Sequence, residues 1–307
     1  MTTIRTELLA DGGAAAAGDE FFRSPPFLEA EGTTHTLAAG DLGLPLIVRE
    51  IPGAGGLADA VSPYGYPGGA GPGGADPAAI DFAPTGLVSI FVRERLGGAP
   101  ALAGGTERSR VQVHDPELPR RLRPRLAGQI RSNERSGWKV EARAGPAAAE
   151  ADLASFEDLY TATMERAGAA PRYFFDAAYL RKVLSHPRSW LLVARSPGLD
   201  AGAGAIAALS DGILHYYLGG TALPALSDSP FKNVVAAMMD LADELGTPLN
   251  LGGGIQAGDG LESFKRGFAN AELPFRTHEI VCDRDAYERL SAGTAAGGFF
   301  PAYRAEP

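Results

Sequence analysis

The sequence predicts a mixed α/β (α+β) protein made of two tandem domains. A chain of 307 residues with 45% hydrophobic content is long enough for two cores of about 150 residues each. Segments that alternate every two residues, as strands do, are interleaved with segments of helical spacing. The Ala- and Gly-rich stretch GPAAAEAD interrupts this pattern near residue 145. We therefore expect a flexible lead-in over 1–25, an N-terminal domain over 26–145 and a C-terminal domain over 146–307.

The N-terminal half contains fewer complete elements than the C-terminal half. Alternating apolar residues predict strands over 42–50, 87–95 and 111–113, and again over 138–142. Four-residue spacing of Leu and Ile predicts an Arg-rich helix over 118–137. The Gly-, Pro- and Ala-rich segment 51–80 reads as a long connection, and such loops are usually functional or disordered.

The C-terminal half has a more regular order of elements. Helices are predicted over 151–167, 176–185, 231–245, 260–268 and 284–290. Strands are predicted over 190–195, 203–209, 213–218, 249–251 and 275–282, and Ser210-Asp211-Gly212 supplies a hairpin turn between two of them. This order is expected of one mixed sheet with helices packed on it.

Composition excludes several classes of protein and site. The net charge of -9 makes the surface as a whole repel polyanions, so we expect no DNA partner. The single cysteine, Cys282, is expected in the core, and the five scattered histidines lack metal-ligand spacing, so no metal is predicted. Because neither a leader peptide nor an 18-residue apolar run is evident, we expect a cytoplasmic protein without membrane insertion.

Basic residues are nevertheless concentrated in one segment. Residues 108–143 contain ten basic and four acidic side chains, which leaves 18 basic and 33 acidic in the rest of the chain. Such a stripe is suited to contact an RNA backbone through its phosphates. It is equally consistent with a solvated helix face. The candidates for contact with tRNA are Arg121, Arg125, Arg131 and Arg135.

Four motifs stand out along the chain: SPYGYPGG at 62–69, IRSNERSGW at 130–138, HYYLGG at 215–220, and LNLGGG at 249–254 followed by GLESFKRGF and PF up to 275. In this order and spacing they resemble Fem-type aminoacyltransferases and their GNAT-fold relatives, over roughly residues 45–290. The resemblance implies two GNAT-like domains with a channel between them. It also implies transfer of an amino acid from aminoacyl-tRNA to the amine of a peptidoglycan precursor or small peptide. Aminoacyl-tRNA would then be a co-substrate, with no bound cofactor.

The resemblance makes Lys265 the leading catalytic candidate, because the lysine at this place in the family motif stabilises developing negative charge. Taken alone, the residues favour a solvated Lys265-Arg266 pair on a helix, and the resemblance reverses this preference. Arg266 is a further candidate for substrate binding. Phe264 lies on the same helical face as Phe268 and would fix the direction of the lysine.

Backbone N–H groups of Gly253 and Gly254 would approach an acyl or phosphate oxygen, although a tight turn explains the glycines as well. Tyr64 and Tyr66 are candidates for binding a peptide or sugar amide, or for covering the core. Tyr216 is the candidate from the HYY strand, with core packing as the alternative.

Asn233 begins a helix at the place where GNAT enzymes seat the pyrophosphate of coenzyme A. The Arg/Gln-x-x-Gly-x-Gly/Ala loop of those enzymes is missing before it, which disfavours acetyl-CoA as the donor. Two alternatives to aminoacyl transfer stay open: an N-acyltransferase that uses acyl-CoA on a small metabolite, and a non-catalytic module that binds a peptide or glycan.

Overall fold

The computed structural model describes residues 3–254, 258–294 and 298–305. The chain forms two compact units, one comprising Met1–Arg108 with Phe275–Pro307 and the other Ser109–Pro274. The first unit is discontinuous in sequence, because the chain leaves it within strand β8 (Thr106–His114) and returns within strand β14 (Ala271–Val281).

The division predicted near residue 145 falls inside the second unit. Strand β9 (Lys139–Ala144) pairs antiparallel with β10 (Ser189–Ser196) along its whole length. The stretch that suggested a break is a short 3-10 turn (Gly145–Ala147) between β9 and helix α3 (Glu150–Ala167). A boundary there would cut the sheet, so the ranges 26–145 and 146–307 do not correspond to the two units.

The first unit contains a sheet with strand order β2-β3-β4-β5-β7-β14, in which β5 and β7 run parallel and the other neighbours antiparallel. The fully buried side chains of this unit include Leu37, Leu44 and Ile90. The elements of this unit, apart from β14, are β1 (Ile4–Arg5), β2 (Glu7–Leu9), α1 (Pro25–Ala30), β3 (His35–Ala39), β4 (Leu42–Glu50), β5 (Ala58–Val61), β6 (Ile80–Asp81), β7 (Ser89–Arg93) and α7 (Arg284–Ser291).

The lead-in over residues 1–25 was predicted to be flexible, and for the described residues this prediction is wrong. Phe21 and Phe22 have no exposed surface, and both rings pack against Phe27 with centroids 5.1 and 5.3 Å away. Burial of such rings offsets the entropy of ordering the segment. The Ala- and Gly-rich sequence before them obscured this anchor. Met1 and Thr2 lie outside the described residues.

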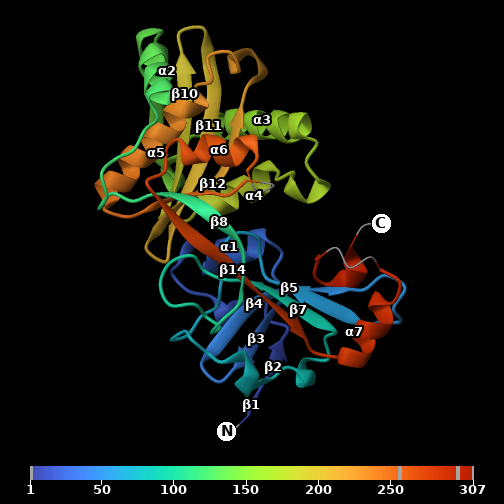
Figure 1. The fold of residues 1–307 in the computed structure, drawn as a ribbon. Helices are drawn as coiled ribbons and strands as arrows, with labels where there is room; N and C mark the ends of the chain where they lie inside the picture. Colours follow the sequence, from blue (N-terminus) through green and yellow to red (C-terminus); the bar gives the residue numbers. More distant parts are fainter. Residues whose placement is uncertain (1–2, 255–257, 295–297, 306–307) are drawn as a thin grey trace. The chain divides into compact units, whose positions relative to one another are not determined.

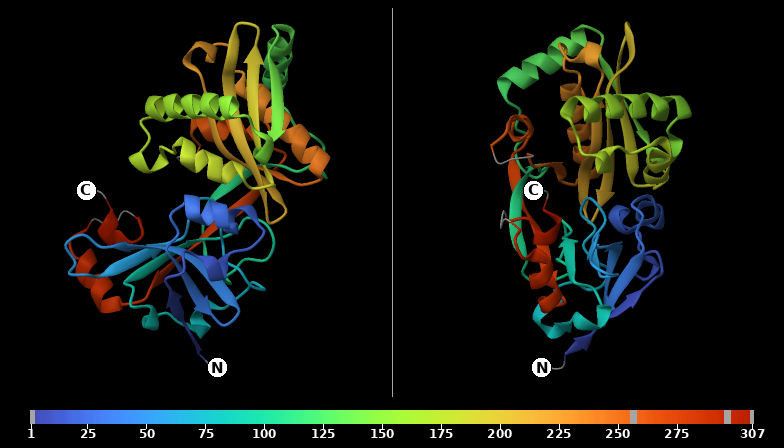
Figure 2. Two further views of the ribbon diagram at one scale, coloured as in Figure 1. Left: turned by 180° about the vertical axis from the view of Figure 1, so that it is seen from behind. Right: turned by 90° about the vertical axis from the view of Figure 1, so that its right-hand side faces the viewer.

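The second unit contains a mixed sheet with strand order β8-β13-β12-β11-β10-β9. Helices α3 and α4 cover one face, and α2, α5 and α6 lie on the other (Figures 1 and 2). The mixed α/β class predicted from the sequence is therefore confirmed. The remaining elements are α2 (Pro124–Arg135), α4 (Ala177–Leu184), β11 (Leu199–Ser210), β12 (Ile213–Thr221), α5 (Phe231–Leu245), β13 (Leu249–Gly252) and α6 (Gly260–Arg266).

The two faces of this sheet follow from the alternation of side chains along β11. Ala205 belongs to the buried cluster that includes Val234 and Met238 of α5. On the opposite face, a Cβ on Gly204 would lie 3.1 Å from the ring of Phe156 on α3. Small residues on both faces of this strand thus allow helices to approach the sheet closely.

Most element predictions for the second unit agree with the structure, and the largest difference is the start of α2. The helix begins at Pro124 rather than at 118. Proline has no N–H to donate and is favoured in the first turn of a helix, so Pro124 starts the helix and the preceding segment stays extended.

Candidate active site

The candidate site lies where strands β12 and β13 stop pairing. Their parallel ladder contains the pairs Leu214–Leu249 and His215–Asn250, after which both strands continue. On its other side, β12 changes register against β11, which leaves Tyr217 as the extra residue of a bulge. Bulges redirect side chains and are frequent beside active sites.

Two consecutive tyrosines, Tyr216 and the bulge residue Tyr217, lie on opposite faces of the sheet, as strand alternation predicts. The ring of Tyr216 lies 5.5 Å from that of Phe231 on α5. The hydroxyl of Tyr217 hydrogen-bonds that of Tyr179 on α4, on the other face of the sheet. Tyr216, the sequence candidate, therefore lies on the face that carries α6.

Lys265 reaches the same place from the last turn of α6. The helix is capped by Asp259, whose side chain accepts a hydrogen bond from the Glu262 N–H at 2.7 Å. The lysine is only 9% exposed, its Nζ donates to the carbonyl oxygen of Gly253 at 2.7 Å, and the Tyr216 ring centroid is 5.7 Å from Nζ. Lys265 and Gly253 of one motif and Tyr216 of another thus meet around one ammonium group.

Burial sets the protonation of this lysine. Desolvation lowers the pKa of Lys265 from 10.5 to about 8, against a smaller opposite effect of Asp259. Within the described part of the chain, no carboxylate forms an ion pair with Nζ. The group is mostly charged at neutral pH and loses its proton in mild alkali, so it is suited both to stabilise an oxyanion and to exchange a proton.

A short chain of hydrogen bonds fixes the backbone that the lysine contacts. The side-chain oxygen of Asn250 accepts from the Gly252 N–H at 2.8 Å, and its amide nitrogen lies 3.0 Å from Nδ1 of His215. Gly252 has a φ of +79°, and a Cβ there would lie 3.0 Å from the Lys265 ammonium. Sequence reasoning did not select Asn250, although the LNLGGG motif contains it.

His215 is 1% exposed, and desolvation lowers its pKa to about 4. The imidazole is therefore neutral at physiological pH. Its contact with the candidate site is the one with the Asn250 amide, and it brings no charge there at this pH.

Phe264 packs its ring 5.2 Å from that of Phe268 and 6.4 Å from that of Phe231, which joins α6 to the core under α5. The role of fixing the direction of Lys265 stays a prediction. Gly254 is exposed and follows the carbonyl that Lys265 contacts.

Asn233 is not brought to the lysine. Its side-chain oxygen accepts from Asn133 at 2.8 Å and its amide donates to the carbonyl of Ile130 at 3.2 Å, so it ties α5 to α2. Asn233 is 5% exposed, and both the oxygen and the nitrogen of its side-chain amide are hydrogen-bonded within the protein. A structural role therefore explains this residue.

Tyr64 and Tyr66 belong to the first unit. The ring of Tyr66 lies 5.8 Å from Phe22 and 5.2 Å from Phe275, as part of an aromatic cluster. Tyr64 is 37% exposed, and its backbone N–H donates to Glu31. Packing on the core is thus evident for Tyr66.

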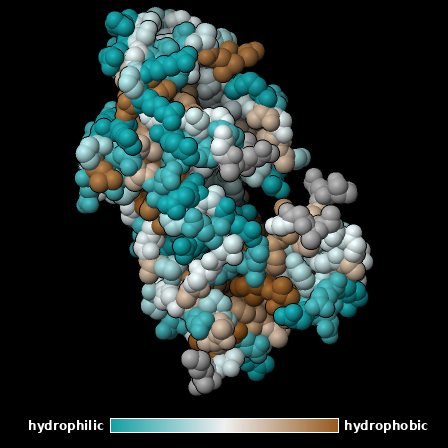
Figure 3. All heavy atoms as spheres, in the orientation of Figure 1, coloured by the Kyte–Doolittle hydropathy of each residue, from teal (hydrophilic) through white to brown (hydrophobic). Residues whose placement is uncertain are grey.

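A pocket of about 690 Å³ lies within the second unit, and Lys265 is not among its lining residues. Arg121 and Arg266 line it, whereas Arg125, Arg131 and Arg135 do not. The face that carries α2, α5 and α6 is largely hydrophilic (Figure 3). The pocket therefore brings Arg121 and Arg266 together, whereas the other three candidate arginines lie on α2 outside it.

Two further structural properties bear on the class of protein. Across residues 3–254, 258–294 and 298–305, no helix has the length and apolar character needed to span a bilayer. The same residues contain no group of three or more His, Cys, Asp or Glu side chains placed to hold a metal ion.

No protein-family model matches the sequence, and no curated protein matches it at a significant level. Solved structures do match by fold. FemX superposes with a TM-score of 0.59 at 12% identity, covering 83% of this chain and 89% of that one. The C-terminal domain of a putative lysylphosphatidylglycerol synthetase from Agrobacterium fabrum gives 0.58 at 14% identity, covering 92% and 95%. L-PGS from Bacillus licheniformis gives 0.54 at 13% identity, covering 83% and 86%. The resemblance to Fem-type proteins inferred from the motifs is thus confirmed at the level of the fold.

Proposed function

We propose that this protein is an acyltransferase that moves an aminoacyl group from aminoacyl-tRNA to the amine of a peptide-type acceptor. The observation that carries the proposal is the buried ammonium of Lys265, held by Gly253 beside Tyr216 where β12 and β13 separate. The shared fold with FemX and with a protein named as a lysylphosphatidylglycerol synthetase supports aminoacyl transfer.

The reaction requires electrostatic stabilisation rather than a covalent intermediate. The acceptor nitrogen attacks the ester carbonyl carbon, the carbonyl oxygen becomes an oxyanion, and the bond to the ribose oxygen then breaks. A proton passes overall from the amine to the departing ribose hydroxyl. An ammonium in a desolvated site stabilises the oxyanion more strongly than it would in water.

The two substrate classes differ in how well they are supported. The missing coenzyme A loop before α5 favours a tRNA-borne donor over acyl-CoA. A small peptide or a cell-wall precursor is the expected acceptor, on the motif resemblance alone.

The test is single-turnover transfer from radiolabelled aminoacyl-tRNA to a panel of peptide amines. The wild-type protein is expected to form an amide that survives mild alkali, which cleaves the donor ester, and Lys265→Met to lower the single-turnover rate constant about 100-fold or more, as for loss of one oxyanion donor. Lys139→Met is the matched control, because Lys139 is exposed on β9, an edge strand that β10 and β11 separate from β12. Turnover of acetyl-CoA without transfer from any aminoacyl-tRNA would overturn the proposal.

A further inference from the structure

The pocket of the second unit has an unusual charge for a chain with a net charge of -9. Four arginines line it, Arg110, Arg121, Arg123 and Arg266, and Glu272 is the one acidic residue in its lining. Two parts of the chain that are distant in sequence supply these cations: β8 with the extended segment that follows it, and the end of α6. The charge is therefore gathered by the fold rather than by one Arg-rich helix face.

The acidic residue neutralises one side of the pocket. Glu272 lies 3.1 Å from Nε of Arg110 and 3.9 Å from Nε of Arg266, and it accepts a hydrogen bond from Gln112 at 2.9 Å. Hydrogen bonds from Gln112 and Arg110 help to lower the pKa of Glu272, so it is ionised at neutral pH. Arg266 is further paired with Glu262.

The opposite side keeps its positive charge. Arg123 donates to the carbonyl oxygen of Ser263 at 3.2 Å, a contact that orients the guanidinium without neutralising it. Within the ranges that the structure describes, no carboxylate forms an ion pair with Arg121, which is exposed. An anion entering the pocket would meet two guanidinium groups that carry uncompensated charge.

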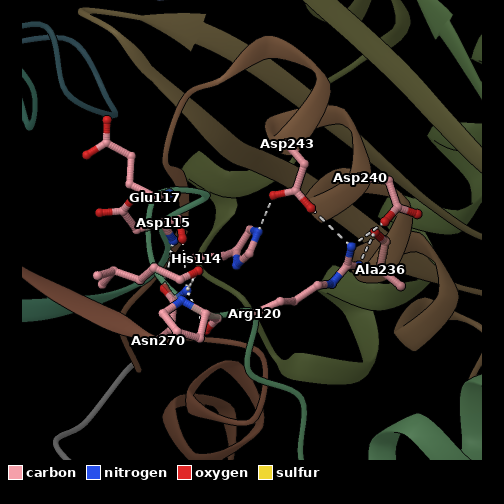
Figure 4. Close-up of polar contacts among 10 residues, drawn as sticks. His114, Asp115, Glu117, Arg120, Ala236, Asp240, Asp243 and Asn270 are labelled. Atoms are coloured by element: carbon pink, nitrogen blue, oxygen red, sulfur yellow. Dashed lines mark hydrogen bonds and ion pairs between the residues drawn. The ribbon is translucent and has the colours of Figure 1, made fainter.

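The segment that carries these two arginines is held in place from both ends, and Figure 4 shows the contacts at its N-terminal end. Arg120 turns toward α5, where it lies 2.6 Å from Asp240 and 3.1 Å from Asp243, and His114 bonds Asp243 at 2.7 Å. Asn270 accepts from the Asp115 N–H at 2.7 Å and donates to its carbonyl at 2.9 Å.

At the other end of the segment, the backbone N–H of Arg123 donates to the Gly267 carbonyl at 3.1 Å. These contacts reduce the freedom that Arg121 and Arg123 would lose on binding an anion, and such preorganisation favours affinity.

We propose that this pocket is a phosphate-binding site, with Arg121 and Arg123 as its principal ligands. Arginine presents two parallel donors that match phosphate oxygens, and the volume accommodates a nucleotide-sized group. If the proposed function holds, and on this point the inference rests on it, the phosphate belongs to the single-stranded 3′ end of the donor RNA. A free pyrophosphate-bearing nucleotide would supply the same chemistry.

The test measures binding by the full chain with two probes: a short single-stranded RNA that ends in CCA, and inorganic pyrophosphate. Arg121→Gln should weaken the Kd of the recognised probe about tenfold, the effect of losing one charge-assisted contact. With RNA, the slope of log Kd against log salt should also fall by about 0.7. Arg166→Gln is the control, because this exposed arginine on α3 bonds the Ala162 carbonyl and the Thr163 hydroxyl and does not line the pocket.

Each outcome separates the site from the reaction. Arg121-dependent binding of either probe supports the phosphate site, and the stronger probe identifies the source. If Arg121→Gln and Arg166→Gln weaken binding equally, or if neither probe binds, the site is overturned, whatever the transfer assay shows. Arg121-dependent RNA binding without aminoacyl transfer would keep the site and reject the proposed function.

Discussion

Lys265→Met is expected to make the protein more stable at neutral pH while it removes the proposed activity. Burial that lowers the lysine pKa from 10.5 to about 8 means that folding disfavours the charged form by about 3 kcal/mol at pH 7. The lost hydrogen bond to Gly253 offsets about 1 kcal/mol of this. Methionine fills nearly the same volume, so the net expectation is a gain of about 2 kcal/mol.

The sign of the pH dependence gives an independent check. Between pH 8 and 10.5, the unfolded chain retains a proton that folded Lys265 has lost, so the wild-type free energy of unfolding rises with pH in this window. The variant lacks this rise. Its advantage should therefore shrink as the pH increases and be close to zero at pH 10, where the remaining burial penalty of about 1 kcal/mol offsets the hydrogen bond.

Urea unfolding of the wild type, Lys265→Met and Lys139→Met at pH 7, 8.5 and 10 measures both effects. The control should stay within about 0.5 kcal/mol of the wild type at each pH, because Lys139 is exposed. A Lys265→Met protein that is less stable at pH 7 by more than about 1 kcal/mol, with a gap that does not change with pH, would refute the reasoning. The ammonium would then stabilise the fold rather than stand ready to act on a substrate.

Two further predictions concern the same site. Because burial lowers the pKa of His215 from 6.5 to about 4, the wild type should lose up to about 3 kcal/mol of stability as the pH falls through this window. Urea unfolding of His215→Gln should show a markedly smaller loss over the same pH range. An identical dependence on pH in the two proteins would contradict the lowered pKa of His215. Gly252→Ala should lower kcat for transfer more than Gly246→Ala does. Both glycines have a positive φ, +79° and +64°, so both variants carry backbone strain of about 1–2 kcal/mol, but a Cβ at 252 alone would lie 3.0 Å from the Lys265 ammonium. Equal kcat values in the two variants would show that placing a Cβ close to the Lys265 ammonium does not affect transfer.

The second unit was largely predictable because its signals are local. The periodicity of FKNVVAAMMDLADEL and the following glycine define α5 over the same residues, 231–245, that the structure assigns. The division of the chain was not predictable in this way. It depends on the antiparallel pairing of β14 with β7, from Thr277 opposite Arg93 to Val281 opposite Ser89, and pairing at this sequence separation leaves no local pattern.

The candidate site was likewise predictable only where its signals are local in sequence. The motifs supplied Lys265 and Tyr216 as separate candidates, but their approach depends on the packing of α6 beside the point where β12 and β13 part. Strand alternation gives the face of Tyr216 but does not indicate which distant helix lies against it. The basic segment 108–143 contains Arg110 and Arg123, but their meeting with Arg266 in one pocket depends on tertiary structure.

Helix α6 contributes a residue to the candidate active site and another to the arginine-lined pocket. Lys265 and Arg266 are consecutive, yet one turns to the Gly253 carbonyl and the other lines the pocket. A net charge of -9 disfavours diffuse binding of a polyanion, so phosphate contacts are worth most where the fold has gathered uncompensated guanidinium groups. A donor bound there by its phosphates would be held by the same short helix that carries the catalytic candidate. Binding energy from a non-reacting part of the substrate would then position the ester for attack. Positioning of this kind lowers the activation barrier of a reaction that proceeds without a covalent enzyme intermediate.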